Sequence, residues 1–261
     1  MRYYVVDAFT DAVFAGNPAG VCMPDETLPA KTMQQIAAEN NLSETAFVYK
    51  RAQAGEYDLR WFTPKSEIDL CGHATLGTAY IVSRFANPGI SVMRFHTQSG
   101  ILTVTRRGDL FEMDFPSRMP APIPLTPLME EALGMPVLEA HLSRDILFVL
   151  PDAQAVRTVT PDFIKLAALE GLGVIVTAPG DEPCVDFVSR FFCPDLGVNE
   201  DPVTGSAHCN LIPFWAERLH KTELLARQLS ERGGTLYCAL QGDRVKISGR
   251  AVLYLQGEIF V

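Results

Sequence analysis

The order of apolar and polar positions along the chain predicts the same succession of elements twice. Each time, a strand and a loop lead to a helix, two strands, a second loop, a second helix and further strands around a Gly-Asp turn. The second helices, "GHATLGTAYIVSRF" and "GSAHCNLIPFWAERL", are apolar on most of their faces. Helices of this kind are buried, so we expect each one to be wrapped by its own strands.

The two halves match each other at a nearly constant separation. The "FTP" at residues 62–64 matches the "FCP" at 192–194 at an offset of 130 (192 − 62). The "CGHA" at 71–74 matches the "TGSA" at 204–207 at an offset of 133 (204 − 71). The Gly-Asp turns follow at an offset of 134 (242 − 108). Such steady offsets indicate an internal duplication of a unit of about 130 residues.

A proline-rich stretch, "PSRMPAPIPLTP" at 116–127, separates the halves. Proline lacks the backbone N–H and fixes φ, so this stretch is neither a helix interior nor a central strand. We expect a linker over 116–127 between an N-terminal lobe over 1–115 and a C-terminal lobe over 128–254. The last residues, 255–261, are expected to cross back and complete the first lobe's sheet. Two lobes joined in this way would face each other across a cleft, a common place for a ligand.

Both second helices begin at a glycine that follows the loop after the matched proline, Gly72 in one half and Gly205 in the other. Free N–H groups and the partial positive charge of a helix N-terminus suit a carboxylate, and glycine lets a ligand approach the backbone closely. The alternative for each glycine alone is a helix start that needs a small residue. The duplication of the pair favours the ligand interpretation.

Composition narrows the function classes. With a net charge of −9, the protein has no basic face that would bind a nucleic acid. The sequence also has no Lys/Arg cluster that would bind an acidic membrane. The first apolar run breaks at Asp7, too early for a signal peptide or a membrane span, so we expect a cytoplasmic protein. The six cysteines form no CxxC pair and the five histidines no HExxH motif. We therefore expect neither a disulfide framework nor a metal site.

Four ordered motifs, "DAFTDAVFAGNPAGVC", "NLSETAFV", "DLCGHATLGTA" and "EDPVTGSAHC", resemble the phenazine-biosynthesis isomerase (PhzF-like) family of the diaminopimelate-epimerase-like superfamily. The resemblance runs from Asp7 to the C-terminus. It implies an α+β fold of two similar lobes, each a β-barrel-like sheet around a central helix, with the site in the inter-lobe cleft. It further implies an isomerase without a cofactor, a small-molecule carboxylate substrate and a homodimer.

The resemblance also implies roles for individual residues. Its catalytic set corresponds here to an acid/base, Glu44 of "LSETAF", together with His73, Asp201 and Ser206. The substrate-binding set corresponds to Asn17, Gly72, Thr204 and Gly205. The residues themselves support Glu44 in part, because its counterpart near Gly173 is not acidic and a carboxylate kept in one half indicates a task that breaks the symmetry. The ordinary alternatives are a solvent-exposed glutamate at a strand edge and a histidine that caps a helix.

Other functions stay open. The epimerases and racemases of this superfamily use one thiol from each helix start, and here Cys71 has Thr204 as its counterpart. A threonine hydroxyl is too weak an acid to replace a thiolate, so a two-thiol mechanism is disfavoured, whereas assistance by Cys71 in an epimerase or racemase stays open. A non-catalytic small-molecule-binding or regulatory homologue and an interaction protein are further alternatives. The retained acid at Glu44 favours the isomerase.

Overall fold

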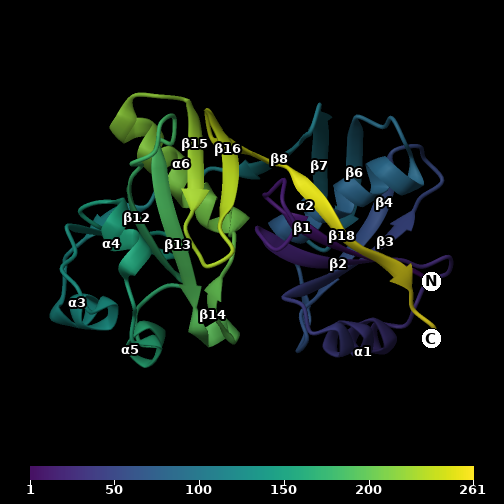
Figure 1. Ribbon diagram of the computed structural model, residues 1–261, viewed down its shortest axis with the longest axis horizontal. Coiled ribbons are helices and arrows are strands. Elements are labelled where there is room, and N and C mark those ends of the chain that lie inside the picture. Colours follow the sequence, from purple (N-terminus) through teal and green to yellow (C-terminus); the bar gives the residue numbers. More distant parts are fainter. The chain divides into compact units, whose positions relative to one another are not determined.

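The structure, a computed structural model, describes residues 1–261 except for the side chain of Leu196. The chain forms two compact units. Unit 1 comprises residues 1–114 and 248–261, and unit 2 comprises residues 115–247, which include the proline-rich segment. Each unit is built from strands around one long buried helix, α2 or α6 (Figure 1). In the described part of the chain, no helix has both the length and the apolar character needed to cross a membrane.

Unit 1 contains two α-helices and a π-helical turn among nine strands. The helical elements are α1 (Ala30–Asn40), α2 (Gly72–Ile81) and η1 (Val82–Ala86). The strands are β1 (Arg2–Ala8), β2 (Asn17–Met23), β3 (Glu44–Lys50), β4 (Glu56–Phe62), β5 (Glu67–Ile68), β6 (Val92–Thr97), β7 (Gly100–Arg107), β8 (Leu110–Pro116) and β18 (Ala251–Glu258).

Unit 2 contains four α-helices and a 3₁₀ turn among nine strands. The helical elements are α3 (Pro127–Leu133), α4 (Ala153–Thr158), α5 (Phe163–Ala167), η2 (Pro194–Leu196) and α6 (Gly205–Leu219). The strands are β9 (Ala121–Ile123), β10 (Glu139–Leu142), β11 (Ile146–Val149), β12 (Val174–Pro179), β13 (Phe187–Cys193), β14 (Val198–Asp201), β15 (Glu223–Gln228), β16 (Gly234–Gln241) and β17 (Arg244–Gly249).

The strands pair in the same order in both units. In unit 1, β1 is antiparallel to β2, β2 parallel to β3, β3 antiparallel to β4, β4 parallel to β6, and β6 antiparallel to β7. In unit 2, β10, β11, β12, β13, β15 and β16 repeat this succession. The short strands β5 and β14 pair with β4 and β13 and precede α2 and α6. The repeat in sequence is thus a repeat in topology.

Helix α2 is buried on nearly all sides because its side chains are small or have polar groups that bond locally. Eight of its ten residues are buried, and it packs against β1, β2, β3 and β18. The hydroxyls of Thr75 and Thr78 donate to the carbonyls of Cys71 and Ala74 at 2.5 and 2.7 Å. These bonds satisfy hydroxyls that would otherwise be costly in an apolar interior.

Helix α6 continues through Pro213, a residue that removes one intrahelical hydrogen bond. The carbonyl four residues earlier, on Cys209, would lack a partner as a result. The backbone N–H of Arg118 donates to that oxygen at 2.9 Å. The proline-rich segment of unit 2 therefore supplies the bond that the helix lacks.

Strand β18 comes from the far end of the chain and pairs with β1 in antiparallel register, from Arg2↔Glu258 to Ala8↔Ala251. The pairing extends to the chain ends, since the terminal amine of Met1 donates to the carbonyl of Ile259 at 3.0 Å and the Ile259 N–H returns a bond at 2.9 Å. Both termini of the chain therefore belong to unit 1.

Gly16 precedes β2 and has a left-handed backbone conformation in a crowded place. Comparison with Gly108 separates the effect of the backbone strain from that of the crowding. Its φ is +66°, and an added Cβ would lie 2.2 Å from the Ala8 carbonyl oxygen. Gly108 has a similar φ of +63°, but no atom of the described residues lies within 4 Å of the position that an added Cβ would take. We expect Gly108→Ala to cost roughly 1–2 kcal/mol of unfolding free energy through left-handed strain alone.

Gly16→Ala should cost about 1–3 kcal/mol more than Gly108→Ala, because the added methyl group also collides with backbone that is held in β1. Urea unfolding of the two variants under the same conditions measures the difference. Equal losses of stability would contradict this expectation and show that the Ala8 carbonyl moves aside easily.

Candidate active site

His73 lies in the first turn of α2 and is buried, with 5% of its surface exposed. The side-chain amide nitrogen of Asn17 lies 3.1 Å from its Nδ1. Its Nε2 lies 3.0 Å from Oε2 of Glu44, an ion pair by distance. The angles of the latter contact do not meet those of a hydrogen bond, so neither atom has an aligned partner among the described residues. A carboxylate and an imidazole thus face each other, and each can form a further hydrogen bond.

The parallel pairing of β2 and β3 explains how these groups come together. Asn17 begins β2, Glu44 begins β3, and Ala19 is the register partner of Glu44. Side chains two residues apart on a strand share a face, so Asn17 and Glu44 lie on the same side of the sheet. Helix α2 packs against both strands and brings His73 to that side.

Cys71 lies beside the same imidazole. It is the N-cap residue of α2, 7% exposed, and its Sγ is 3.6 Å from Nδ1 of His73. Burial raises the pKa of the Cys71 thiol, and the Glu44 carboxylate raises it further, against a smaller lowering by His73. The thiol is therefore protonated at neutral pH. A protonated thiol is a poor base, which sets Cys71 apart from an activated catalytic cysteine.

The electrostatics of the cluster favour a charged imidazole, which donates from both nitrogens and so requires the Asn17 amide to turn its oxygen to Nδ1. Burial by itself lowers the pKa of His73, but the charges of Cys71 and Glu44 outweigh it and place the pKa well above the ordinary 6.5. Glu44 contributes to this rise after Cys71. A raised folded-state pKa adds stability that is fully present below pH 6.5 and is lost as the pH rises through the raised value.

Replacing the carboxylate should therefore change the charge of the imidazole. In Glu44→Gln we expect the pKa of His73 to fall relative to the wild type, because the burial that disfavours the imidazolium is then opposed by less negative charge. Titration of the His73 ring nitrogens by ¹⁵N NMR measures the pKa.

Glu56→Gln is the matched control, since Glu56 pairs with a different histidine, His96, at 2.9 Å in the same unit. It should leave the titration of His73 unchanged. If Glu44→Gln left the pKa of His73 as high as in the wild type, Glu44 would not be the group that holds the proton on the ring.

A second group of candidate residues surrounds the start of α6 in unit 2. Asp201 ends β14, Thr204 is the N-cap residue, and Gly205 and Ser206 form the first turn. The Thr204 hydroxyl donates to Oδ2 of Asp201 at 2.5 Å. The guanidinium of Arg144 donates to Oγ of Ser206 at 3.0 Å. Asp201 and Ser206 thus each accept a hydrogen bond from a neighbouring side chain.

His208, one turn into α6, has a structural role and is not part of this group. Burial lowers its pKa to about 4, although the Thr204 carbonyl partly opposes the effect. The ring is therefore neutral, and its Nδ1–H donates to the carbonyl of Thr204 at 2.8 Å. The His208 ring therefore carries no charge at neutral pH, whereas the raised pKa of His73 favours a charged ring.

The starts of α2 and α6 share one chemical property. Among the described residues, no side chain caps either helix with a hydrogen bond, and neither first turn contains an acidic residue. The first N–H groups of each helix, at Gly72 and Gly205, therefore retain donor capacity and partial positive charge. Each start offers a place for an anionic oxygen.

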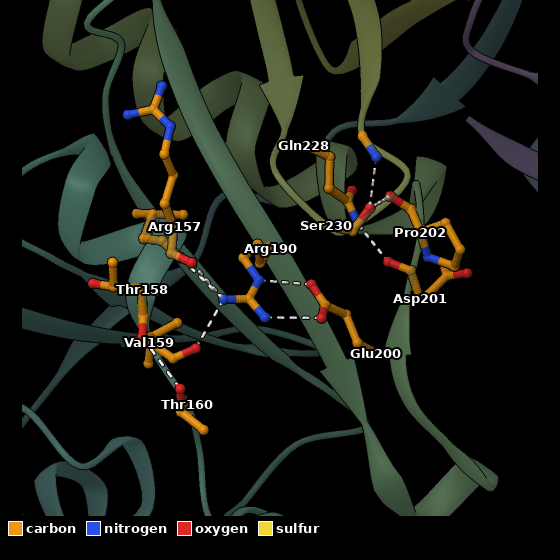
Figure 2. A network of polar contacts seen from close by, with 12 residues as sticks. Arg157, Thr158, Val159, Thr160, Arg190, Glu200, Asp201, Pro202, Gln228 and Ser230 are labelled. Carbon is orange, nitrogen blue, oxygen red and sulfur yellow. Dashed lines mark hydrogen bonds and ion pairs between the residues drawn. The ribbon is translucent and has the colours of Figure 1, made fainter. Parts of the chain in front are cut away.

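The segment from Glu200 to Thr204 is held by polar contacts from β13, from β15 and from Ser230 (Figure 2). Arg190 on β13 forms a two-bond ion pair with Glu200 at 2.6 and 2.8 Å. The Ser230 hydroxyl, just after β15, donates to the Pro202 carbonyl at 2.7 Å. Gln228, at the end of β15 and fully buried, contacts both Asp201 and Thr204. These contacts leave the loop little freedom.

One set of donors in the described chain has a composition that metals accept. An oxygen of Glu44, the sulfur of Cys71 and a nitrogen of His73 lie within 4.8 Å of one another. Carboxylate, thiolate and imidazole are zinc ligands, but the two ring nitrogens already face Asn17 and Glu44. We therefore interpret the set as a proton-transfer cluster.

The structure brings the sequence-predicted residues into two groups, one in each unit. Asn17, Glu44, Gly72 and His73 belong to unit 1, and Asp201, Thr204, Gly205 and Ser206 to unit 2. Arg144 and Gln228 were not among the residues predicted from the sequence. Gln228 had a signal, because Leu224, Ala226 and Gln228 share the inward face of β15 and a glutamine among inward apolar residues needs a polar partner. Arg144 had no comparable signal.

Comparison with known proteins shows the family. The model of the family described as "Phenazine biosynthesis-like protein" matches residues 6–257. A protein named an uncharacterized isomerase from Pseudomonas aeruginosa is 50% identical over 99% of this chain and 98% of its own. The crystal structure of a phenazine biosynthesis protein of the PhzF family from Enterococcus faecalis is 52% identical, with a TM-score of 0.96 over 100% of this chain and 99% of that one.

A more distant structure supports the fold alone. A probable proline racemase from Agrobacterium radiobacter K84 is 10% identical, with a TM-score of 0.65 over 100% of this chain and 93% of that one. The predicted α+β fold, diaminopimelate-epimerase-like with sheets around central helices, is confirmed by these neighbours.

Proposed function

Because this chain belongs to the phenazine biosynthesis-like protein family, we propose that it is an isomerase that moves a proton, and with it a double bond, on a small carboxylate. The pair of partly buried Glu44 and buried His73 carries the proposal. A carboxylate beside a histidine of raised pKa is an acid/base group with a second proton held next to it. No cofactor is needed for a proton shift between two carbons.

Glu44 is the group that transfers the proton. It removes a proton from one carbon of the activated carboxylate, the electron pair shifts along the conjugated system, and the protonated Glu44 returns the proton to another carbon on the same face. One carboxylate performs both steps when it reaches both carbons. The partial exposure of Glu44 supports this role, because a carboxylate that transfers a proton to carbon has to be reached by the substrate.

The remaining candidate residues bind and orient the ligand. The uncapped helix starts at Gly72 and Gly205 offer N–H donors to carboxylate oxygens. Ser206 and Asp201 offer a hydroxyl and a carboxylate to further polar groups, and Asn17 keeps the His73 ring in place. His73 balances the negative charge of Glu44 while Glu44 carries no proton.

A cysteine-assisted epimerase or racemase is the second candidate, favoured by the contact of Cys71 with His73 at 3.6 Å. In that reaction the thiol would deliver a proton to the face opposite the base. The raised pKa of Cys71 suits a proton donor but not a base, and Thr204 occupies the corresponding position in unit 2. A non-catalytic binding homologue has no specific observation in its favour and would have no use for the Glu44–His73 pair.

The test is proton exchange in D₂O with a panel of unsaturated, cyclic and amino carboxylates, followed by NMR. The wild type should introduce deuterium at carbon into at least one compound and shift its double bond. Glu44→Gln keeps size and removes the base, so exchange should fall by about 10²–10⁴-fold while ligand affinity is largely retained.

Cys71→Ala is the matched variant, since Cys71 and Glu44 contact the same imidazole. It should reduce exchange far less than Glu44→Gln. If Cys71→Ala abolished turnover and Glu44→Gln left it intact, the proton would move through the thiol and the proposed mechanism would be wrong. Inversion of one stereocentre without movement of a double bond would favour the epimerase.

A further inference from the structure

Gln228 makes three hydrogen bonds to the loop that carries Asp201. Its Oε1 accepts from the backbone N–H of Thr204 at 2.9 Å. Its Nε2 donates to the backbone carbonyl of Asp201 at 2.7 Å and to the hydroxyl oxygen of Thr204 at 3.2 Å. Gln228 is 0% exposed, so water does not compete for these bonds. Figure 2 shows Gln228 beside the loop, next to Asp201 and Pro202.

The orientation of this amide is determined by the backbone. A backbone N–H can only donate and a carbonyl can only accept, so the oxygen of Gln228 has to face Thr204 and the nitrogen has to face Asp201. The opposite orientation would place two donors together at one end and two acceptors at the other. The amide nitrogen is therefore the atom that reaches the Thr204 hydroxyl.

The fixed amide in turn fixes the direction of the hydroxyl. Because Nε2 donates to Oγ1 of Thr204, the hydroxyl proton points elsewhere, and Oδ2 of Asp201 lies 2.5 Å away as its acceptor. We propose that Gln228 is a positioning residue that aims the Thr204 hydroxyl at Asp201 and so keeps Asp201 an oriented carboxylate. The proposal rests on the proposed function only in giving Asp201 a task at the site.

Two charged residues next to the bonded ones in sequence, Glu200 and Arg227, are each paired. Glu200 precedes it on β14 and is held by Arg190 of β13, which also donates to three carbonyls between Val156 and Val159. On β15, Arg227 precedes Gln228 and pairs with Glu182 at 2.5 and 2.7 Å. The variants proposed below leave these two ion pairs in place.

The experiment is a ¹³C NMR titration of protein labelled at the aspartate carboxyl carbons, with Asp201→Asn to assign the signal. Thr204→Val removes the hydroxyl and should raise the pKa of Asp201 by about one unit, since a bond to the charged form is lost. Gln228→Met keeps length without hydrogen bonds and lets the hydroxyl turn, so it should raise the pKa by roughly half a unit.

The double variant separates positioning from general loosening. If Gln228 acts through the hydroxyl, Gln228→Met should add nothing to the pKa once Thr204→Val is present. Ser230→Ala is the control, because it removes a different bond to the same loop, the one to the Pro202 carbonyl. It should leave the pKa of Asp201 unchanged.

Three results would overturn the proposal: an unchanged pKa in Gln228→Met, additive shifts in the double variant, or an equal shift in Ser230→Ala. If Gln228→Met does not fold, the same titration is followed in the wild type through the side-chain amide signals of Gln228. These signals should shift with the pH midpoint at which Asp201 titrates. A different midpoint would refute the coupling of Gln228 to Asp201 through Thr204. No substrate is used, so failure here leaves the exchange test of Glu44 standing, and failure there leaves this one standing.

Discussion

An imidazole buried in the interior of a sheet needs a partner at each of its two nitrogens, and His73 imposes this requirement on unit 1. Asn17 contacts one nitrogen and Glu44 faces the other. Since these two residues begin β2 and β3, the parallel register of the strands and the start of α2 have to agree with each other. The polar cluster of unit 1 therefore forms only if β2, β3 and the start of α2 have this arrangement.

Unit 2 has the same strand order but meets its polar requirements differently. Ser206 stands where unit 1 has His73, and β12, the counterpart of β3, begins with buried Val174 in place of Glu44. A buried valine needs no partner, so the start of β12 contributes no acid to a pair like that of Glu44 and His73. The polar groups of unit 2 gather instead on the loop before α6, around Asp201. Duplication supplied two similar backbones, and substitution at a few positions made one of them suited to proton transfer.

The family and the fold could be predicted from the sequence because ordered motifs and the repeat are properties of the chain itself. Contacts across the fold could not. Gln228 lies 24 residues after Thr204, and Arg144 lies 62 residues before Ser206, so each contact depends on strand register that no local pattern determines. The roles of the site residues remain proposals.

The pairing of β18 with β1 has a consequence for the order in which the protein is made. During synthesis, the residues of unit 2 leave the ribosome as one uninterrupted stretch, whereas unit 1 waits for β18, which follows all of unit 2 in the chain. Domains generally fold as units when their residues become available. The half that carries Glu44 and His73 is begun first and finished last, so a nascent chain passes through a stage in which β1 presents an unpaired edge.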